Sequence, residues 1–136
     1  MHTCTNLILI AEDDPEDQEL IAYAFFKADP SIEIHIVTNG IEVLNYLNIL
    51  DSNKLPCVIL LDYNMPELNG AQVIQHLSPD SRFKSIPKII LSTSDNPIFI
   101  QESFSNGAND YKVKPDNMSD LVIIAKELVI LCKNAA

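Results

Sequence analysis

Four groups of polar side chains stand directly after short apolar runs in this 136-residue sequence, and together they could act on a phosphate group. They are the acids Glu12, Asp13 and Asp14, the single acid Asp62, the hydroxyl residues Ser92, Thr93 and Ser94, and the cation Lys114. Clustered carboxylates repel one another, and a bound cation relieves that repulsion. Oxygen ligands without a nearby His or Cys suit Mg²⁺, which often bridges to phosphate.

A carboxylate can also attack a phosphoryl group as a nucleophile and form an aspartyl-phosphate. Such a transfer requires in-line positioning and neutralisation of the equatorial phosphoryl oxygens. Mg²⁺ would supply part of the positive charge, and Lys114 would supply another part as a point charge. The hydroxyl group of Ser92 could donate a hydrogen bond to a third oxygen, which leaves Asp62 as the candidate nucleophile.

Each group also has an ordinary structural explanation. Acids after a strand often stand at the start of a helix, and Asp62 could simply end a strand before the turn-like segment Asn64-Met65-Pro66. A serine at a strand end is usually structural, and a lysine before a proline, such as Lys114, is usually a solvated loop residue. The chemical interpretation therefore depends on whether the four groups meet in the folded chain.

The elements that would position these groups are short apolar strands alternating with longer helical patterns. Strands are predicted at residues 7–11, 33–37, 57–61, 88–91 and 110–113, and helices at 15–27, 41–49, 70–77, 97–104 and 118–132. Strands that lack polar alternation and are each followed by a helix predict a parallel sheet covered on both faces. Right-handed crossovers then give an α/β fold, a doubly wound three-layer αβα sandwich of five βα units. Ligands of such sheets bind beyond the carboxyl ends of the strands, where all four groups stand.

Composition and charge exclude several classes of protein. A chain of 136 residues that is 47% hydrophobic and 21% charged is typical of one folded domain rather than a disordered segment. The formal net charge of −10 argues against binding to a nucleic-acid backbone. There is no apolar run of about 18 residues to span a membrane and no secretory signal, so we expect a cytoplasmic protein. Cys4, Cys57 and Cys132 are odd in number and lack metal-ligand spacing, which predicts reduced thiols.

The stretches ILIAEDD, ILLDYNMPELNG, IPKIILSTS and GANDYKVKP resemble the receiver domain of two-component response regulators. The resemblance covers nearly the whole chain, and the spacings from Asp13 to Asp62, to Ser92 and to Lys114 also agree with the family. It implies a flavodoxin-like fold with the strand order 2-1-3-4-5. It also implies a single receiver domain over residues 1–136, with its core at about 6–133 and no output domain.

The resemblance assigns the acids to a phosphoryl and metal site. Asp62 would be the phosphoacceptor, Asp13, Asp62 and the backbone carbonyl of Asn64 would bind Mg²⁺, and Glu12 would orient a metal-bound water. Three consecutive acids leave open which pair faces the metal. We favour Glu12 and Asp13 over Asp14 because Asp13 then has the family's spacing from Asp62.

The resemblance also assigns the residues that respond to the phosphoryl group. Ser92 would be the switch hydroxyl, Lys114 would contact the phosphate, and Tyr111 would be the aromatic switch residue. Thr93 stands where many receivers have alanine, and its branched side chain would restrict access to the phosphoryl group.

The implied function is that of a stand-alone receiver of the chemotaxis or phytochrome-partner type. A histidine kinase or phosphotransfer domain would phosphorylate it, and the change would alter its affinity for a downstream protein. It would catalyse only its own phosphorylation and dephosphorylation. Two alternatives are a degenerate receiver that ignores phosphate, although no key residue is missing, and an aspartyl-phosphate phosphatase. The phosphatase would need an acid where Asn64 stands.

The last predicted helix has more apolar residues than one buried face requires. Its core face would comprise Met118, Leu121, Ile124, Ala125, Leu128, Leu131 and Cys132, and the residues outside that face are Val122, Ile123, Val129 and Ile130. The alternatives are a wide buried stripe or scattered exposure, and a contact patch. In receivers the fourth helix, fifth strand and fifth helix form the usual dimer face, so we expect a homodimer through this face.

Overall fold

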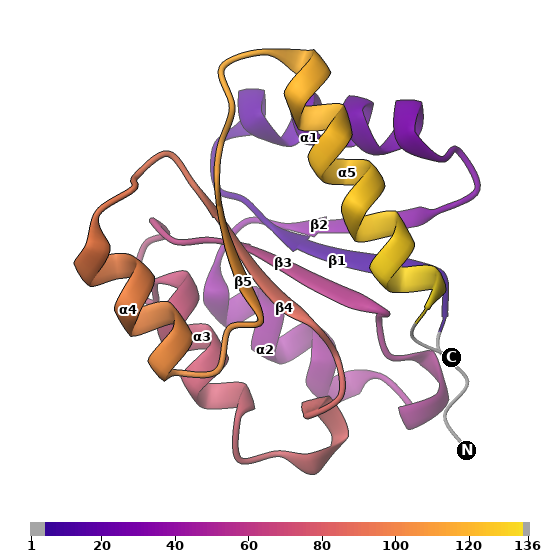
Figure 1. Ribbon diagram of the computed structural model, residues 1–136. Coiled ribbons are helices and arrows are strands. Elements are labelled where there is room, and N and C mark those ends of the chain that lie inside the picture. Colours follow the sequence, from indigo (N-terminus) through magenta and orange to yellow (C-terminus); the bar gives the residue numbers. More distant parts are fainter. Residues whose placement is uncertain (1–4, 135–136) are drawn as a thin grey trace.

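Five parallel strands form one sheet in the order β2-β1-β3-β4-β5 in the computed structural model, which describes residues 5–134 (Figure 1). The strands are β1 (Leu7–Ala11), β2 (Glu33–Val37), β3 (Val58–Asp62), β4 (Lys88–Ser92) and β5 (Asp110–Val113). This order confirms the flavodoxin-like, doubly wound fold. All residues of β3 and β4 are buried, whereas the edge strands β2 and β5 are partly exposed. Central strands covered on both faces explain the unbroken apolar runs in the sequence.

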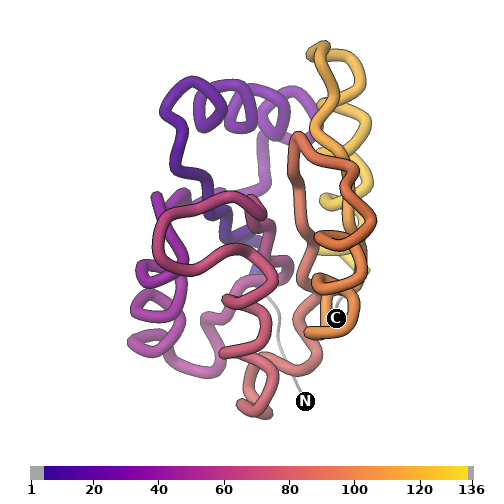
Figure 2. Tube along the Cα trace, turned by 90° about the vertical axis from the view of Figure 1, so that its left-hand side faces the viewer, coloured from indigo at the N-terminus to yellow at the C-terminus, as the bar shows by residue number. Residues whose placement is uncertain are grey.

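Helices cover both faces of the sheet (Figure 1). They are α1 (Pro15–Ala28), α2 (Gly40–Ile49), α3 (Gly70–Leu77), α4 (Pro97–Ser105) and α5 (Met118–Lys133), with short 3₁₀ turns η1 (Ser52–Lys54) and η2 (Ser81–Phe83). One apolar cluster joins the sheet to α1 and α5, and a second cluster joins it to α2 and α3. Figure 2, seen from the left-hand side of Figure 1, looks onto the connections that follow the strands. No helix within residues 5–134 is long and apolar enough to cross a membrane.

The predicted elements agree with the structure except at their ends. β3 and β4 each extend one residue further than predicted, so Asp62 and Ser92 are the last residues of their strands rather than the first residues of loops. Asp62 is aligned with Leu91 on β4, and Ser92 is aligned with Val113 on β5. The sheet backbone therefore holds both functional candidates.

The expectation for α5 is wrong at two positions. Val129 is buried although it was placed outside the core face, and Leu131 is 40% exposed although it was placed on that face. The physical reason is that α5 packs against α1 as well as against the sheet, which widens and turns its buried stripe. Ile123 and Ile130 are exposed as predicted.

The expectation of reduced thiols is wrong for two of the three cysteines. Cys57, just before β3, and Cys132, in the last turn of α5, form a disulfide with a Cα–Cα distance of 4.9 Å. They are 75 residues apart in sequence and meet only because α5 packs on the sheet beside β3. Cys4 lies outside the described residues.

Candidate functional site

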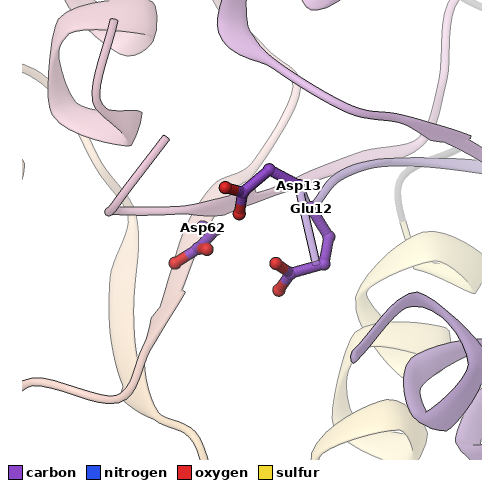
Figure 3. Close-up of side chains that lie close together, drawn as sticks. All are labelled: Glu12, Asp13 and Asp62. Carbon is purple, nitrogen blue, oxygen red and sulfur yellow. The ribbon is translucent and has the colours of Figure 1, made fainter. Parts of the chain in front are cut away.

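Three acids meet at the carboxyl edge of the sheet. Glu12, Asp13 and Asp62 each offer a carboxylate oxygen, and these oxygens all lie within 4.8 Å of one another (Figure 3). Glu12 and Asp62 are buried, while Asp13 is exposed. The third consecutive acid, Asp14, instead caps α1, because its side chain accepts a hydrogen bond from the backbone N–H of Glu16. The structure therefore favours Glu12 and Asp13 as the pair that accompanies Asp62.

The position of Asp62 is fixed by the strand before it and by the loop after it. Every residue of β3 is buried, which gives the acid a rigid base. The backbone N–H of Asn64 donates to Asp62 Oδ1 at 3.3 Å. A Cβ atom at Gly70 would lie 2.6 Å from the Asp62 carbonyl oxygen, so the start of α3 can pack this closely only with glycine. The loop 63–69 is thereby held close to the acid.

The ammonium group of Lys114 lies among the acids. Its Nζ is 2.6 Å from Glu12 Oε1, 3.1 Å from Asp17 Oδ2 and 3.7 Å from Asp62 Oδ2. Its backbone N–H donates to the carbonyl oxygen of Ser92 at 2.7 Å, which ties the residue to the end of β4. Burial alone would lower the pKa of Lys114, but the hydrogen bond to Glu12 and the charges of Asp62 and Glu12 outweigh it and raise that pKa. Lys114 is therefore a fully charged group at this site.

Sequence reasoning missed Asp17 as a member of the site. Asp17 lies in the first turn of α1, whereas Lys114 follows β5, 97 residues later. No spacing rule within the sequence signals a contact of that kind, since it depends on how α1 sits over the sheet edge.

The acids themselves are poorly stabilised as charges. Burial raises the pKa of Glu12 to about 7, although the hydrogen bond from Lys114 acts in the opposite direction. Burial likewise raises the pKa of Asp62, against the effect of the Lys114 charge and the Asn64 N–H. Buried carboxylates of this kind favour a bound cation, which would offset their repulsion. The oxygen-only donor set therefore fits a hard divalent cation.

Ser92 and Thr93 lie at the same edge of the sheet. Ser92 is fully buried at the end of β4, and its Oγ accepts a hydrogen bond from the Ser94 backbone N–H at 3.2 Å. Within residues 5–134 no acceptor is found for its own O–H, which is therefore available to donate. Thr93 is exposed at the start of the loop before α4. The Tyr111 hydroxyl group donates to the carbonyl oxygen of Ser94 at 2.7 Å, so β5 contacts this loop directly.

A further contact missed by sequence reasoning begins one residue after Asp62. The buried ring of Tyr63 stacks on Phe99 of α4 with a centroid distance of 4.4 Å. Its hydroxyl group donates to Glu102 Oε1 at 2.6 Å. Burial, together with the Glu102 carboxylate, raises the pKa of Tyr63 to about 12. Tyr63 thus joins the segment that follows the acid to α4.

The sequence is similar to a known protein family and to individual proteins of that family. A family model described as the response regulator receiver domain matches residues 8–126. The probable methanogenesis regulatory protein FilR2 of Methanothrix harundinacea is 29% identical over 124 residues, which span 90% of this chain and 80% of that protein.

Two solved structures are similar over nearly the whole fold. The phosphorylated cyanobacterial phytochrome response regulator RcpA is 31% identical with a TM-score of 0.83, covering 100% of this chain and 97% of RcpA. The Mn²⁺-bound form of response regulator Rcp1 is 27% identical with a TM-score of 0.76, covering 90% of each chain.

Proposed function

Because this chain belongs to the family of response regulator receiver domains, we propose that it accepts a phosphoryl group on Asp62 from the phosphohistidine of a histidine kinase or phosphotransfer domain. Receiver domains of two-component systems are signalling domains, and we place this exchange in the cytoplasm, where the ATP that charges such kinases is found. The observation that carries the proposal is the convergence at one sheet edge of the buried acid Asp62, two further acids and the charged Lys114. A carboxylate in this setting can act as nucleophile.

Three side chains of this protein take part in the transfer: Asp62, Lys114 and Ser92. A carboxylate oxygen of Asp62 forms a bond to phosphorus as the bond from phosphorus to the histidine nitrogen breaks. That nitrogen keeps the bonding electron pair, and the imidazole, which carries a proton on its other ring nitrogen, leaves as the neutral base. Lys114 holds positive charge beside the phosphoryl oxygens, and the free O–H of Ser92 donates to one of them. Catalysis here is mostly positioning and charge stabilisation.

The acids would hold Mg²⁺ beside the phosphoryl group. Asp13, Asp62 and the backbone carbonyl of Asn64 are the proposed direct ligands, and Glu12 would hold a metal-bound water. When bound, Mg²⁺ would neutralise charge on the phosphoryl oxygens. The Mn²⁺-bound state of the similar protein Rcp1 supports a divalent cation in this fold.

Phosphorylation would bias a two-state equilibrium and so change affinity for a downstream protein. Ser92, Thr93 and Tyr111 are the proposed responding residues. The Tyr111–Ser94 hydrogen bond supports this, because it couples β5 to the loop that begins beside Ser92.

We also propose that the exposed apolar side chains of α4, β5 and α5 form a homodimer face. Ile98 on α4, Val113 on β5, and Ile123 and Ile130 on α5 are all exposed. Sedimentation with and without beryllofluoride, a mimic of the phosphoryl group, tests association. We expect dimerisation to strengthen with the mimic and to weaken in Ile123→Asp. A monomer under both conditions at high concentration would exclude the dimer.

Intact mass spectrometry tests the phosphoryl transfer itself. Incubation with acetyl phosphate and Mg²⁺ should add a single phosphoryl group to the wild-type protein. Asp62→Asn should abolish the adduct while its thermal unfolding stays cooperative. An equal adduct on the Asn variant would show that another residue accepts the phosphoryl group.

A further inference from the structure

Asp17 makes a contact with Lys114 that the proposed phosphoryl chemistry does not by itself require. The carboxylate of Asp17 is about one-third exposed, its side chain being 31% accessible, and it pairs with an ammonium group that is 13% accessible. The helix that carries Asp17 is well anchored at this end, because α1 begins with Pro15 and is capped by Asp14. The acid is therefore presented from a rigid element.

The three carboxylates around Lys114 Nζ are not equivalent. Glu12 Oε1 and Asp17 Oδ2 both accept hydrogen bonds from Nζ, at 2.6 Å and 3.1 Å. Asp62 Oδ2, at 3.7 Å, lies beyond hydrogen-bond range. An ammonium group has three N–H bonds in fixed tetrahedral directions. With two of them used by Glu12 and Asp17, the third has no hydrogen-bond acceptor among residues 5–134, and Asp62 Oδ2 is the next carboxylate oxygen, at 3.7 Å.

We propose that Asp17 is a positioning residue for phosphoryl transfer, which holds the Lys114 ammonium so that its free N–H faces the phosphoryl group on Asp62. The inference rests on the proposed function. Lysine has a flexible four-carbon stem, and one partner, Glu12, would leave Nζ free to rotate about that contact. The second hydrogen bond removes this freedom, and a displacement of about 1 Å at such a site can cost up to roughly 100-fold in rate.

The backbone of Lys114 does not need Asp17 for its placement. Its N–H already donates to the carbonyl oxygen of Ser92 at 2.7 Å, and Pro115 restricts the residue that precedes it. What Asp17 adds is the orientation of the side chain. Loss of Asp17 should therefore change the chemistry at Asp62 more than it changes the fold.

Two substitutions separate hydrogen bonding from charge. Asp17→Asn removes the negative charge but keeps an oxygen that can accept from Lys114. Asp17→Ala removes both. If Asp17 acts by positioning, Asp17→Ala is slow and Asp17→Asn is close to wild type. If Asp17 instead weakened Lys114 by neutralising its charge, both variants would be faster than wild type.

The experiment measures the rate of Asp62 phosphorylation over a range of acetyl phosphate concentrations with Mg²⁺ present. We expect the maximal rate of Asp17→Ala to fall roughly three- to tenfold, with Asp17→Asn within about twofold of wild type. Glu16→Ala is the matched control, because Glu16 is an exposed acid in the same helical turn. Its side chain forms no ion pair or hydrogen bond with any residue of the described range 5–134. A rate for Asp17→Ala equal to or above that of the control would overturn the proposal.

A nitrogen NMR signal provides a readout independent of the reaction. The Lys114 ammonium protons should exchange slowly enough to be observed in the wild type and in Asp17→Asn, and should be lost in Asp17→Ala. An unchanged signal in Asp17→Ala would show that Glu12 alone orients the group and would also refute the proposal. If the wild type takes up no phosphoryl group, the proposed function fails. If the wild type is phosphorylated and Asp17→Ala matches it, only the role of Asp17 fails.

Discussion

Each charged residue of the site has its properties set by neighbours from other elements. Glu12 on the β1–α1 connection has its pKa raised by burial, and Lys114 after β5 has its pKa raised by the acids around it. Burial also raises the pKa of Asp62, and the charge of Lys114 acts against that rise. Because buried acids lie together here, the site should respond strongly to an added cation.

Mg²⁺ should stabilise the folded protein by binding to the acids. Binding to the native state adds RT ln(1 + [L]/Kd) to the free energy of unfolding, which is roughly 1.4 kcal/mol at about 10 times Kd. Thermal unfolding of the wild type should therefore shift upward with Mg²⁺, and the shift should shrink in Asp13→Ala. Equal shifts in the two proteins, or none in the wild type, would argue against Asp13 as a ligand.

Thr93 should prolong the life of the phosphorylated state. The residue is exposed directly after the buried Ser92, and its β-branched side chain would hinder an attacking water. Thr93→Ala should shorten the half-life of the phosphoryl adduct, measured by its decay after the donor is removed. Thr93→Ser, which keeps the hydroxyl group without the methyl group, separates bulk from hydrogen bonding. An unchanged or longer half-life in Thr93→Ala would remove this role.

At the scale of the elements, the segment after β3 is joined to α4 by one side chain. Tyr63 stacks on Phe99 and donates its hydroxyl group to Glu102, while Gly70 lets α3 pack against the Asp62 carbonyl. A change at Asp62 therefore has a direct physical route to α4. Such a route counts as coupling only if its removal alters the response.

Tyr63→Phe should weaken this connection while preserving the ring stack. Loss of the hydrogen bond to the Glu102 carboxylate should lower the free energy of unfolding by about 1.5–3 kcal/mol, measured by urea unfolding. Tyr23→Phe is the control, because Tyr23 is exposed on α1. Hydrogen exchange of the α4 amides should also change less on addition of beryllofluoride in Tyr63→Phe than in the wild type. Identical exchange in both proteins would exclude Tyr63 as the connection.

At the scale of the whole molecule, the C-terminal end of α5, which lies away from the site, is covalently linked to the segment before β3. Its last turn carries Cys132, bonded to Cys57, and Lys133, which pairs with Asp29 at the end of α1 at 2.6 Å. Val129 is buried in the apolar cluster that joins α5 to α1 and the sheet. This corner of the fold is held by a covalent bond, an ion pair and apolar packing together.

Reduction of the Cys57–Cys132 disulfide should destabilise the protein. A bond that closes a loop of 75 residues restricts the unfolded chain, and such bonds typically contribute roughly 2–5 kcal/mol. Thermal unfolding with a phosphine reductant should occur at a lower temperature than without it, and alkylation should then label Cys57 and Cys132 in addition to Cys4. Cys132→Ser should unfold at the lower temperature with or without reductant. If the non-reduced wild type already reacts with the alkylating reagent at Cys57, the bond is absent in solution.

The sequence by itself determined the fold class, the element order and the grouping of Asp62 with the acids that follow β1. Unbroken apolar runs mark buried parallel strands whatever their partners are, and the carboxyl ends of parallel strands must share one edge, so Glu12, Asp13, Asp62, Ser92 and Lys114 could be grouped before any contact was known. Phosphorylation of Asp62 and the ligation of Mg²⁺ stay predictions.

Only the tertiary structure decided which partners these residues find. Three contacts join parts of the chain that are far apart in sequence: Asp17–Lys114, Tyr63–Glu102 and the Cys57–Cys132 disulfide. The burial of Val129 likewise depends on how α5 packs against other elements. Periodicity describes which face of one element is apolar, whereas these contacts depend on the relative placement of two elements. Asp14 shows the same limit locally. The residue types alone do not show which of three consecutive acids caps the helix. The hydrogen bond from the Glu16 N–H to the Asp14 side chain identifies Asp14 as the cap and leaves Glu12 and Asp13 for the site.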